Sequence, residues 1–176
     1  LGGVANGAAI RANSIHANDS LGIDLEWDGI PEVNDAFDSD NGANFLQNYP
    51  VLSDALCSPL FLGASLRLIG TLNSGISSAY TIDFFSNTSC DASGYGEGQT
   101  YLGSTGVVTS AGGSASFDVT FSLGNCATTL WITATAIDGS GNTSECSFCR
   151  EVLLDTDADG IADVNDNCPT VANAGQ

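Results

Sequence analysis

The sequence contains no methionine, one histidine and only three basic residues, which stand against 21 acidic ones. The missing methionine predicts that Leu1 is not a translation start and that the chain is a processed or ordered piece of something longer. A formal charge of −18 argues against binding to nucleic acid or to anionic lipid surfaces, because both would repel the chain. Cations are the expected partners.

Long apolar runs are missing as well. No stretch approaches the roughly 18 uninterrupted apolar residues of a membrane-spanning helix, and no signal peptide is present, so any export signal is expected to have been removed. His16 lies in a predicted turn, and no serine or cysteine stands in the context of a nucleophile. We therefore expect no enzymatic activity. A glycosidase-like carboxylate pair stays open, with the isolated candidates Asp83, Glu97, Asp118 and Glu145.

Six cysteines in a chain with one histidine favour disulfides and an oxidising, extracellular compartment. The alternative is zinc, but Cys146 and Cys149 form a lone CxxC with no second pair and no histidine nearby. The residues alone do not decide which cysteines pair.

Strand patterns dominate the region from Ser65 to Leu154. In Thr129 to Ile137, alternate residues are apolar, which predicts a strand with one packed face. Turn signals recur at the spacing of antiparallel strands folded into two stacked sheets. We predict an all-β fold, a β-sandwich of about seven strands. The expected strands include 65–72, 79–85, 100–109, 115–123, 129–137 and 146–154, with turns at Asn73–Gly75, Ala111–Gly113 and Asp138–Asn142.

Residues 1–26 lack this pattern, since Ile10, Ile15 and Ile23 stand among small residues and asparagines. Short strands with asparagine at the corners are typical of a coil of a parallel β-helix, which cannot bury its own face and needs a neighbour. The alternative is an extended lead-in, or a donor-type strand that pairs with the edge of a sheet.

Residues 27–56 are predicted to be an acidic loop followed by a lead-in, which enters the sandwich as a strand or edge segment. Seven acids and three asparagines fall between residues 24 and 44, together with turn residues that let several oxygens converge on one cation. An ordinary solvated loop is the alternative. The secondary metal candidates are Asp28, Asn34, Asp35, Asp38 and Asp40.

The sharpest motif runs from Asp155 to Asp166, directly after the last predicted strand. Carboxylates fill positions 1, 3, 5, 9 and 12 of a calcium loop, Gly160 stands at position 6, and position 7 supplies a backbone carbonyl. An EF-hand would continue into a helix, but Asn167-Cys168-Pro169 follows instead. The predicted Ca²⁺ ligands are Asp155, Asp157, Asp159, Ile161, Asp163 and Asp166.

The segment DTDADGIADVNDNCP resembles a thrombospondin type 3 repeat, a calcium-wrapped module of secreted adhesive and surface proteins. Residues 8–153 resemble the C-terminal part of secreted bacterial parallel β-helix surface proteins that end in an immunoglobulin-like domain. This second resemblance implies an immunoglobulin-like sandwich over residues 57–154, followed by the repeat at 155–176. It also implies a Cys90–Cys149 disulfide, because relatives carry a cysteine in the CDxSGxGEG segment together with one just after GNTSE.

We therefore expect an extracellular, calcium-stabilised structural or adhesive module, a subunit of a surface fibre or part of a long surface protein. Its partners would be further copies, associated head to tail, or adjacent modules of the same chain. The alternative is a carbohydrate-binding module of a secreted enzyme. Its sugar platforms would be aromatic residues that otherwise serve packing, namely Trp27, Trp131, Tyr95 and Tyr101.

Overall fold

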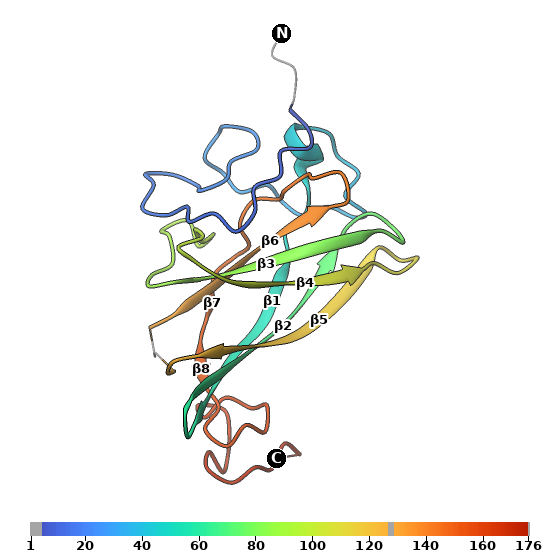
Figure 1. Cartoon of the computed structure of the whole chain (residues 1–176). Coiled ribbons are helices and arrows are strands. Elements are labelled where there is room, and N and C mark those ends of the chain that lie inside the picture. The colour runs from blue at the N-terminus through green and yellow to red at the C-terminus, as the bar shows by residue number, and fades with distance from the viewer. Residues whose placement is uncertain (1–4, 127–128, 176) are drawn as a thin grey trace.

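The computed structural model describes residues 5–126 and 129–175, which form an all-β fold with no α-helix among them. Eight strands make two four-stranded sheets, which confirms the predicted all-β class (Figure 1). The elements are the short 3-10 helix η1 (Ala43–Leu46), β1 (Val51–Leu60), β2 (Gly63–Asn73), β3 (Ala79–Asn87), β4 (Thr100–Val108), β5 (Ser114–Leu123), β6 (Trp131–Asp138), β7 (Arg150–Glu151) and β8 (Leu153–Leu154).

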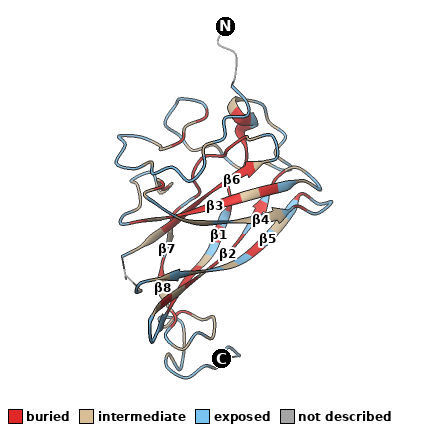
Figure 2. Ribbon diagram, viewed as in Figure 1, coloured by how far each residue is buried: buried red, intermediate tan, exposed pale blue. Residues whose placement is uncertain are grey.

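The first sheet has the order β5-β2-β1-β8 and the second β4-β3-β6-β7. All pairs are antiparallel except β1 with β8, which run parallel. The sheets face each other across an apolar core, visible as the buried inner positions of the strands in Figure 2. The alternation predicted for β6 is confirmed, because its alternate residues enter the core. The fully buried core side chains include Leu66, Leu68, Ile82, Phe84, Ile132, Ala134 and Ala136.

Residues 51–56, which were expected to lead into the sandwich as a strand or edge segment, form the beginning of β1 and pair with β2. The last predicted strand differs from the prediction. The single strand expected at 146–154 is instead divided between β7, at the edge of the second sheet, and β8, at the edge of the first. Val152 lies between them, 5% exposed, and its N–H donates to the carbonyl of Leu130. The chain therefore crosses from one sheet to the other within two residues.

The outer face of β3 and β6 is buried as well, whereas the sequence predicted only one packed face for the strand at 129–137. This second buried face is polar. Asp83 of β3 and Thr133 and Thr135 of β6 are at most 2% exposed. Arg11 reaches Asp83 with two nitrogens, Nε to Oδ2 at 3.2 Å and Nη2 to Oδ1 at 2.8 Å. A buried carboxylate is costly unless it is paired and hydrogen-bonded, so Arg11 fixes the early part of the chain over this face.

We call residues 5–50 the N-terminal segment, residues 51–154 the body and residues 155–175 the C-terminal repeat. The N-terminal segment lies at one end of the body and the C-terminal repeat at the other (Figure 1). The N-terminal segment contains no strand, and its one isolated bridge joins Ile15 to Gly98. This arrangement gives no support for a β-helix coil at 1–26, of which residues 1–4 lie outside the described residues.

Side chains of the body hold the N-terminal segment by its backbone. Glu145 is 2% exposed, and its carboxylate accepts the N–H groups of Leu25 at 2.9 Å and Glu32 at 2.8 Å. Burial raises the pKa of Glu145 above its usual range. Within the segment, Asn44 bonds both backbone groups of Ala8 through its side-chain amide. The segment is thus organised by long-range polar contacts.

Two disulfides tie the body together. Cys90 bonds Cys149, the pair that the family resemblance implies, and Cys57 bonds Cys126. Cys146 is a buried free thiol, whose pKa burial raises to about 12, and Cys168 is exposed and free. Among the described residues, no helix is long and apolar enough to cross a membrane.

Candidate metal centre

The C-terminal repeat begins on a fixed point of the first sheet. β8 pairs with β1 through Leu56 with Leu153 and Cys57 with Leu154. The next residue, Asp155, extends the ladder, because its N–H donates to the carbonyl of Cys57 at 3.0 Å. Asp155 is 3% exposed. The first carboxylate of the predicted loop is therefore buried and positioned by the body.

The three carboxylates at loop positions 1, 3 and 5 converge. Asp155, Asp157 and Asp159 each bring one oxygen within 4.8 Å of the others. The loop closes around them through backbone N–H groups, since Gly160 donates to Asp155 Oδ2 at 3.1 Å and Ile161 donates to Asp159 Oδ1 at 2.9 Å. Gly160 has a φ of +97°, a conformation that an L side chain rarely adopts.

Two oxygens of this cluster are buried with no hydrogen-bond donor among the described residues: Oδ1 of Asp155 and Oδ2 of Asp157. A carboxylate oxygen that is shielded from water and has no hydrogen-bond donor is unfavourable, because the lost hydration is not replaced. Loss of hydration raises the pKa of Asp157, and repulsion from Asp159, Asp166 and Asp155 raises it further. A hard cation bound by oxygens, such as Ca²⁺, supplies the charge that these atoms lack.

The other predicted ligands occupy different places. Asp163 turns to Thr156, accepting its N–H at 2.7 Å and its hydroxyl at 2.6 Å, so this carboxylate closes the loop instead of joining the cluster. Asp166 lies near enough to Asp157 to raise its pKa, and its Oδ1 accepts the N–H of Cys168. Ile161 is bound to the cluster through its N–H, as described above.

Asn173 is a ligand candidate that the sequence did not reveal. Its Oδ1 is buried with no donor among the described residues. Its N–H donates to Asp159 Oδ2 at 2.8 Å, and its Nδ2 donates to Asn167 Oδ1 at 2.7 Å. The residue lies 14 positions after Asp159, beyond the twelve-residue motif, so loop spacing could not have found it.

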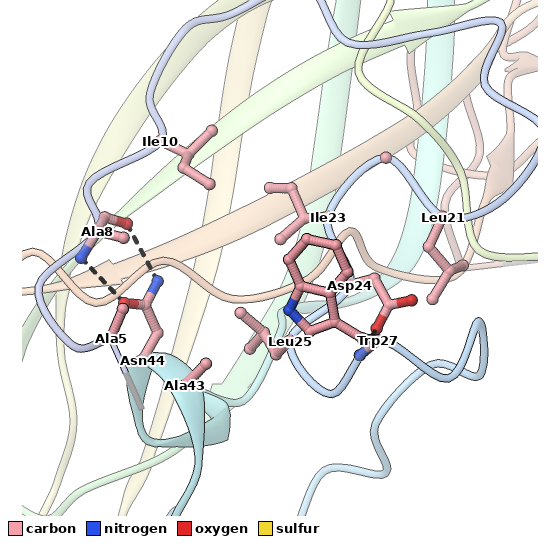
Figure 3. A pocket seen from close by; sticks show the side chains of 11 residues that line it. Ala5, Ala8, Ile10, Leu21, Ile23, Asp24, Leu25, Trp27, Ala43 and Asn44 are labelled. Atoms are coloured by element: carbon pink, nitrogen blue, oxygen red, sulfur yellow. Dashed lines mark hydrogen bonds between the residues drawn. The ribbon is translucent and has the colours of Figure 1, made fainter. Parts of the chain in front are cut away.

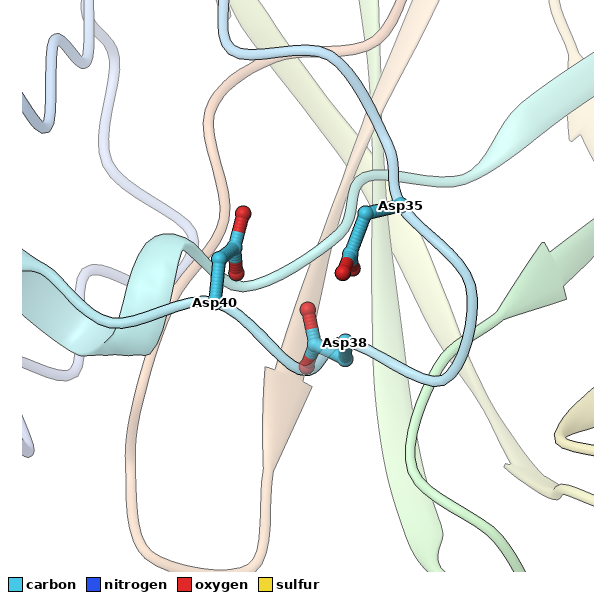
Figure 4. A group of neighbouring side chains, drawn as sticks. All are labelled: Asp35, Asp38 and Asp40. Carbon is cyan, nitrogen blue, oxygen red and sulfur yellow. The ribbon is translucent and has the colours of Figure 1, made fainter.

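A second acidic cluster lies in the N-terminal segment. Asp35, Asp38 and Asp40 each bring one oxygen within 4.8 Å of the others and point toward a common centre (Figure 4). Of the other two secondary candidates, Asp28 accepts the N–H of Ile30, and Asn34 exchanges two hydrogen bonds with the backbone of Tyr49. Three of the five predicted residues therefore come together.

Most oxygens of this second cluster already have donors. Asp35 accepts the N–H and hydroxyl of Ser39, and Asp38 accepts the N–H of Asn48 at 2.7 Å and the hydroxyl of Ser74 at 2.8 Å. Oδ1 of Asp40 is the cluster's one buried oxygen with no donor within the described part of the chain. Burial raises the pKa of both Asp38 and Asp40. This cluster can accept a cation, but its own hydrogen bonds already hold it together.

Comparison with known proteins identifies the C-terminal region. The family model of the thrombospondin type 3 repeat matches residues 148–176. No curated protein matches the chain. Thrombospondin type 3 repeats are calcium-binding, extracellular modules, and the match covers the cluster of Asp155, Asp157 and Asp159 together with Asn173. The two disulfides agree with a secreted protein.

Proposed function

We propose that this chain is an extracellular structural module whose C-terminal repeat is ordered by Ca²⁺. The observation that carries the proposal is Asp155, which is 3% exposed, has one buried oxygen with no donor in the described chain, and continues the ladder of the first sheet. An ion bound by Asp155 is therefore linked directly to the body. Calcium would turn the repeat into a stiff extension of the sheet.

The residues of the repeat have different roles at the calcium site. Asp155, Asp157 and Asp159 supply converging carboxylate oxygens, and Asn173 supplies an uncharged amide oxygen from the far end of the repeat. Asp163 locks the turn through Thr156. Because Asn173 is also bonded to Asp159, the ion would join the beginning and the end of the repeat. At a free calcium concentration of about 100 times the Kd, the folded repeat gains about 2.7 kcal/mol.

The finer proposal is a subunit of a surface fibre or a part of a long, adhesive surface protein, with an immunoglobulin-like sandwich as its body. Exposed apolar side chains at both ends support it. Phe61 and Leu62, 100% and 88% exposed, form the β1–β2 connection at the end that carries the repeat (Figure 1). Trp27 and Val33, 91% and 81% exposed, belong to the N-terminal segment at the other end. Such ends suit contacts with adjacent modules or further copies.

Calorimetric calcium titration tests the metal site. The wild type is expected to bind Ca²⁺, and the double variant Asp157→Asn/Asp159→Asn is expected to bind it at least tenfold more weakly while the body stays folded, as judged by circular dichroism. The double variant Asp19→Asn/Glu151→Gln removes the same formal charge at exposed positions outside the cluster and serves as the control. Unchanged affinity in the loop variant refutes the assignment.

Electron microscopy tests the fibre. Native material would be imaged in negative stain with calcium and again after chelation with EGTA. Filaments that lose order on chelation are the expected result for a calcium-locked subunit. Dispersed single particles in both conditions would refute the fibre and leave a module of a longer surface protein.

The alternative, carbohydrate binding, rests on Trp27. Its ring stands at the rim of a cavity of about 370 Å³ lined by apolar side chains including Ile10, Ile23 and Leu25 (Figure 3). The polar side chains of the cavity are occupied, since Asp24 accepts the N–H groups of Trp27 and Gly29. Sugar hydroxyls would therefore find few donors and acceptors there, which favours the structural function.

The other proposed platforms are less available. Tyr95 packs edge-on between Tyr49 and Phe148, with ring centroids 5.5 and 5.4 Å away. Trp131 is partly buried on β6. A glycan array separates the two functions: binding that disappears in Trp27→Ala but persists in Trp131→Ala would establish the alternative, and no binding at all would eliminate it.

A further inference from the structure

Arg67 lies on β2 between the buried core residues Leu66 and Leu68. Because side chains alternate along a strand, Arg67 stands on the outer face of the first sheet. There Asp118 of β5 holds two of its three guanidinium nitrogens, Nε at 2.9 Å and Nη2 at 2.6 Å. Both partners are about half exposed, 42% and 50%, so solvent screens the pair and it adds little to stability by itself. Its effect is to orient the guanidinium.

The third nitrogen, Nη1, is directed at the metal loop. It lies 3.1 Å from the point that a β-carbon on Gly160 would occupy. Gly160 is the residue whose N–H donates to Asp155 Oδ2. The guanidinium therefore packs against the backbone that closes the loop over the buried carboxylate.

Charge supports the same contact. The hydrogen bonds to Asp118 are the main reason that the pKa of Arg67 is raised, and the negative charges of Asp155 and Asp54 add to the effect. The other two arginines are paired elsewhere, Arg11 with Asp83 and Arg150 with Asp54. In a chain with three basic residues, one of them is placed where it attracts the first carboxylate of the metal loop.

We propose that Arg67 is a positioning residue of the calcium site: held by Asp118, it docks the loop at Gly160 on the first sheet and so couples ion binding to the stability of the body. The inference rests on the proposed function. Without this contact the loop would be joined to the body through the β8 ladder, through Asp155, and through the N–H of Asp163, which donates to the carbonyl of Leu154 at 2.8 Å. All of these contacts lie at β8, so none of them reaches the turn at Gly160. The ion would then order the repeat while stabilising the body much less.

The test compares the calcium-induced rise in Tm between variants, measured in saturating Ca²⁺ and in EGTA. Arg67→Gln is expected to lose at least half of the rise shown by the wild type. Arg150→Gln removes an arginine of similar exposure from β7 and is expected to keep the full rise. Arg67→Lys keeps the charge but lacks the fork that reaches Asp118 and Gly160 together, so it is expected to lose as much as Arg67→Gln.

A local measurement accompanies the Tm. Amide exchange at Gly160, followed by NMR in calcium, is expected to be about tenfold faster in Arg67→Gln than in the wild type, the equivalent of about 1.4 kcal/mol. Asp118→Asn leaves Arg67 in place but weakens its anchor, and is expected to reproduce both effects. This variant decides the question if Arg67→Gln does not fold.

The outcomes are distinct. A full rise in Tm in both Arg67→Gln and Asp118→Asn overturns the inference and leaves the calcium site intact. A full rise in Arg67→Lys alone also overturns it, because charge without positioning would then suffice. Absence of calcium binding in the wild type overturns the proposed function together with the inference.

Discussion

The N-terminal segment and the C-terminal repeat are both acidic and nearly free of strands, yet they are held in opposite ways. The N-terminal segment is held by hydrogen bonds within the protein: the body's Asp83 binds Arg11, and the body's Glu145 accepts two backbone N–H groups of the segment. The segment's own Asp38 accepts the N–H of Asn48 and the hydroxyl of Ser74, and Oδ1 of Asp40 is the one buried carboxylate oxygen of residues 5–50 with no described donor. In the C-terminal repeat, Asp155 and Asp157 keep buried oxygens that no described donor reaches. Whether an acidic segment needs a cation therefore depends on how many of its buried carboxylate oxygens lack a hydrogen-bond donor, and not on the number of carboxylates.

The largest effect is expected at Arg11, whose ion pair with Asp83 holds the N-terminal segment on the body. Arg11→Ala leaves Asp83, which is fully buried, without its charged partner, and the free energy of unfolding is expected to fall by about 3–5 kcal/mol. Urea denaturation followed by tryptophan fluorescence measures the loss. Arg150→Ala breaks a pair in which both partners are more than 40% exposed and should cost less than about 1 kcal/mol. Equal losses for the two variants would mean that the N-terminal segment is not held by this ion pair.

Removal of calcium should affect the C-terminal repeat and leave the N-terminal segment unchanged. In EGTA, amide exchange across residues 155–175 is expected to accelerate. Exchange across residues 5–50 is expected to stay the same, because hydrogen bonds from Ser39, Asn48 and Ser74 already hold Asp35 and Asp38. The unfolding free energy should fall by about 2.7 kcal/mol relative to calcium at 100 times the Kd. Hydrogen exchange with mass spectrometry measures both segments in one experiment. Equal acceleration in residues 5–50 would show that the cluster of Asp35, Asp38 and Asp40 also needs a cation.

Glu145→Gln tests the hydrogen bonds that hold the N-terminal segment on the body. The amide replaces one carboxylate oxygen by a donor, which then faces the N–H of Leu25 or of Glu32. The expected loss of stability is about 1–3 kcal/mol, with unchanged calcium affinity by calorimetry. Asp91→Asn, a turn residue of the body whose carboxylate accepts the N–H of Ser93, is a control for the loss of a carboxylate that bonds backbone elsewhere in the body. A changed calcium affinity in Glu145→Gln would show that the two ends are coupled.

The smallest expected effect is on pH dependence without calcium. Burial raises the pKa of Glu145 and of Asp38, so the folded protein retains protons that the unfolded chain releases near pH 4. Stability contributed by these groups therefore falls as the pH rises from about 4 through their folded pKa values. In EGTA, Tm should rise as the pH is lowered from 7 toward 5. Asp91 and Asp118, whose pKa values are lowered, act in the opposite sense.

Thermal scans of Glu145→Gln/Asp38→Asn test this assignment, since the double variant should show a flatter dependence of Tm on pH. With calcium present the trend should reverse, because protons compete with the ion for the carboxylates of the repeat. The same slope in the double variant and the wild type would assign the pH dependence to other groups.

The sequence predicted the strands where one face alternates, as in β6, because Ile132, Ala134 and Ala136 enter the core. It did not predict the division of 146–154 between two sheets. This division depends on residues that are distant in sequence, because Cys149 forms a disulfide with Cys90 and the N–H of Val152 donates to the carbonyl of Leu130. The N-terminal segment was the least predictable part. Its conformation is set by the body residues Asp83, Thr143 and Glu145, which no local pattern reveals.

The metal centre was predictable to the extent that it is local. Spacing alone identified Asp155, Asp157 and Asp159, which the structure brings together. Spacing could not show that Asp163 would bond Thr156, because it gives the position of a carboxylate in the loop and not whether that carboxylate binds an ion or a nearby hydroxyl. Nor could it find Asn173, which returns to the cluster only after the chain has turned past Pro169.

The Cys57–Cys126 disulfide has a mechanical consequence. A pull on the C-terminal repeat enters the body at Cys57, whose carbonyl holds Asp155, and Cys57 is covalently attached across a sequence separation of 69 residues. At 3.3–3.6 Å per extended residue, this crosslink withholds about 240 Å of chain from stretching. Under load the extension of the body would therefore be limited by this crosslink, and the molecule would act as a tether with a built-in limit to its extension.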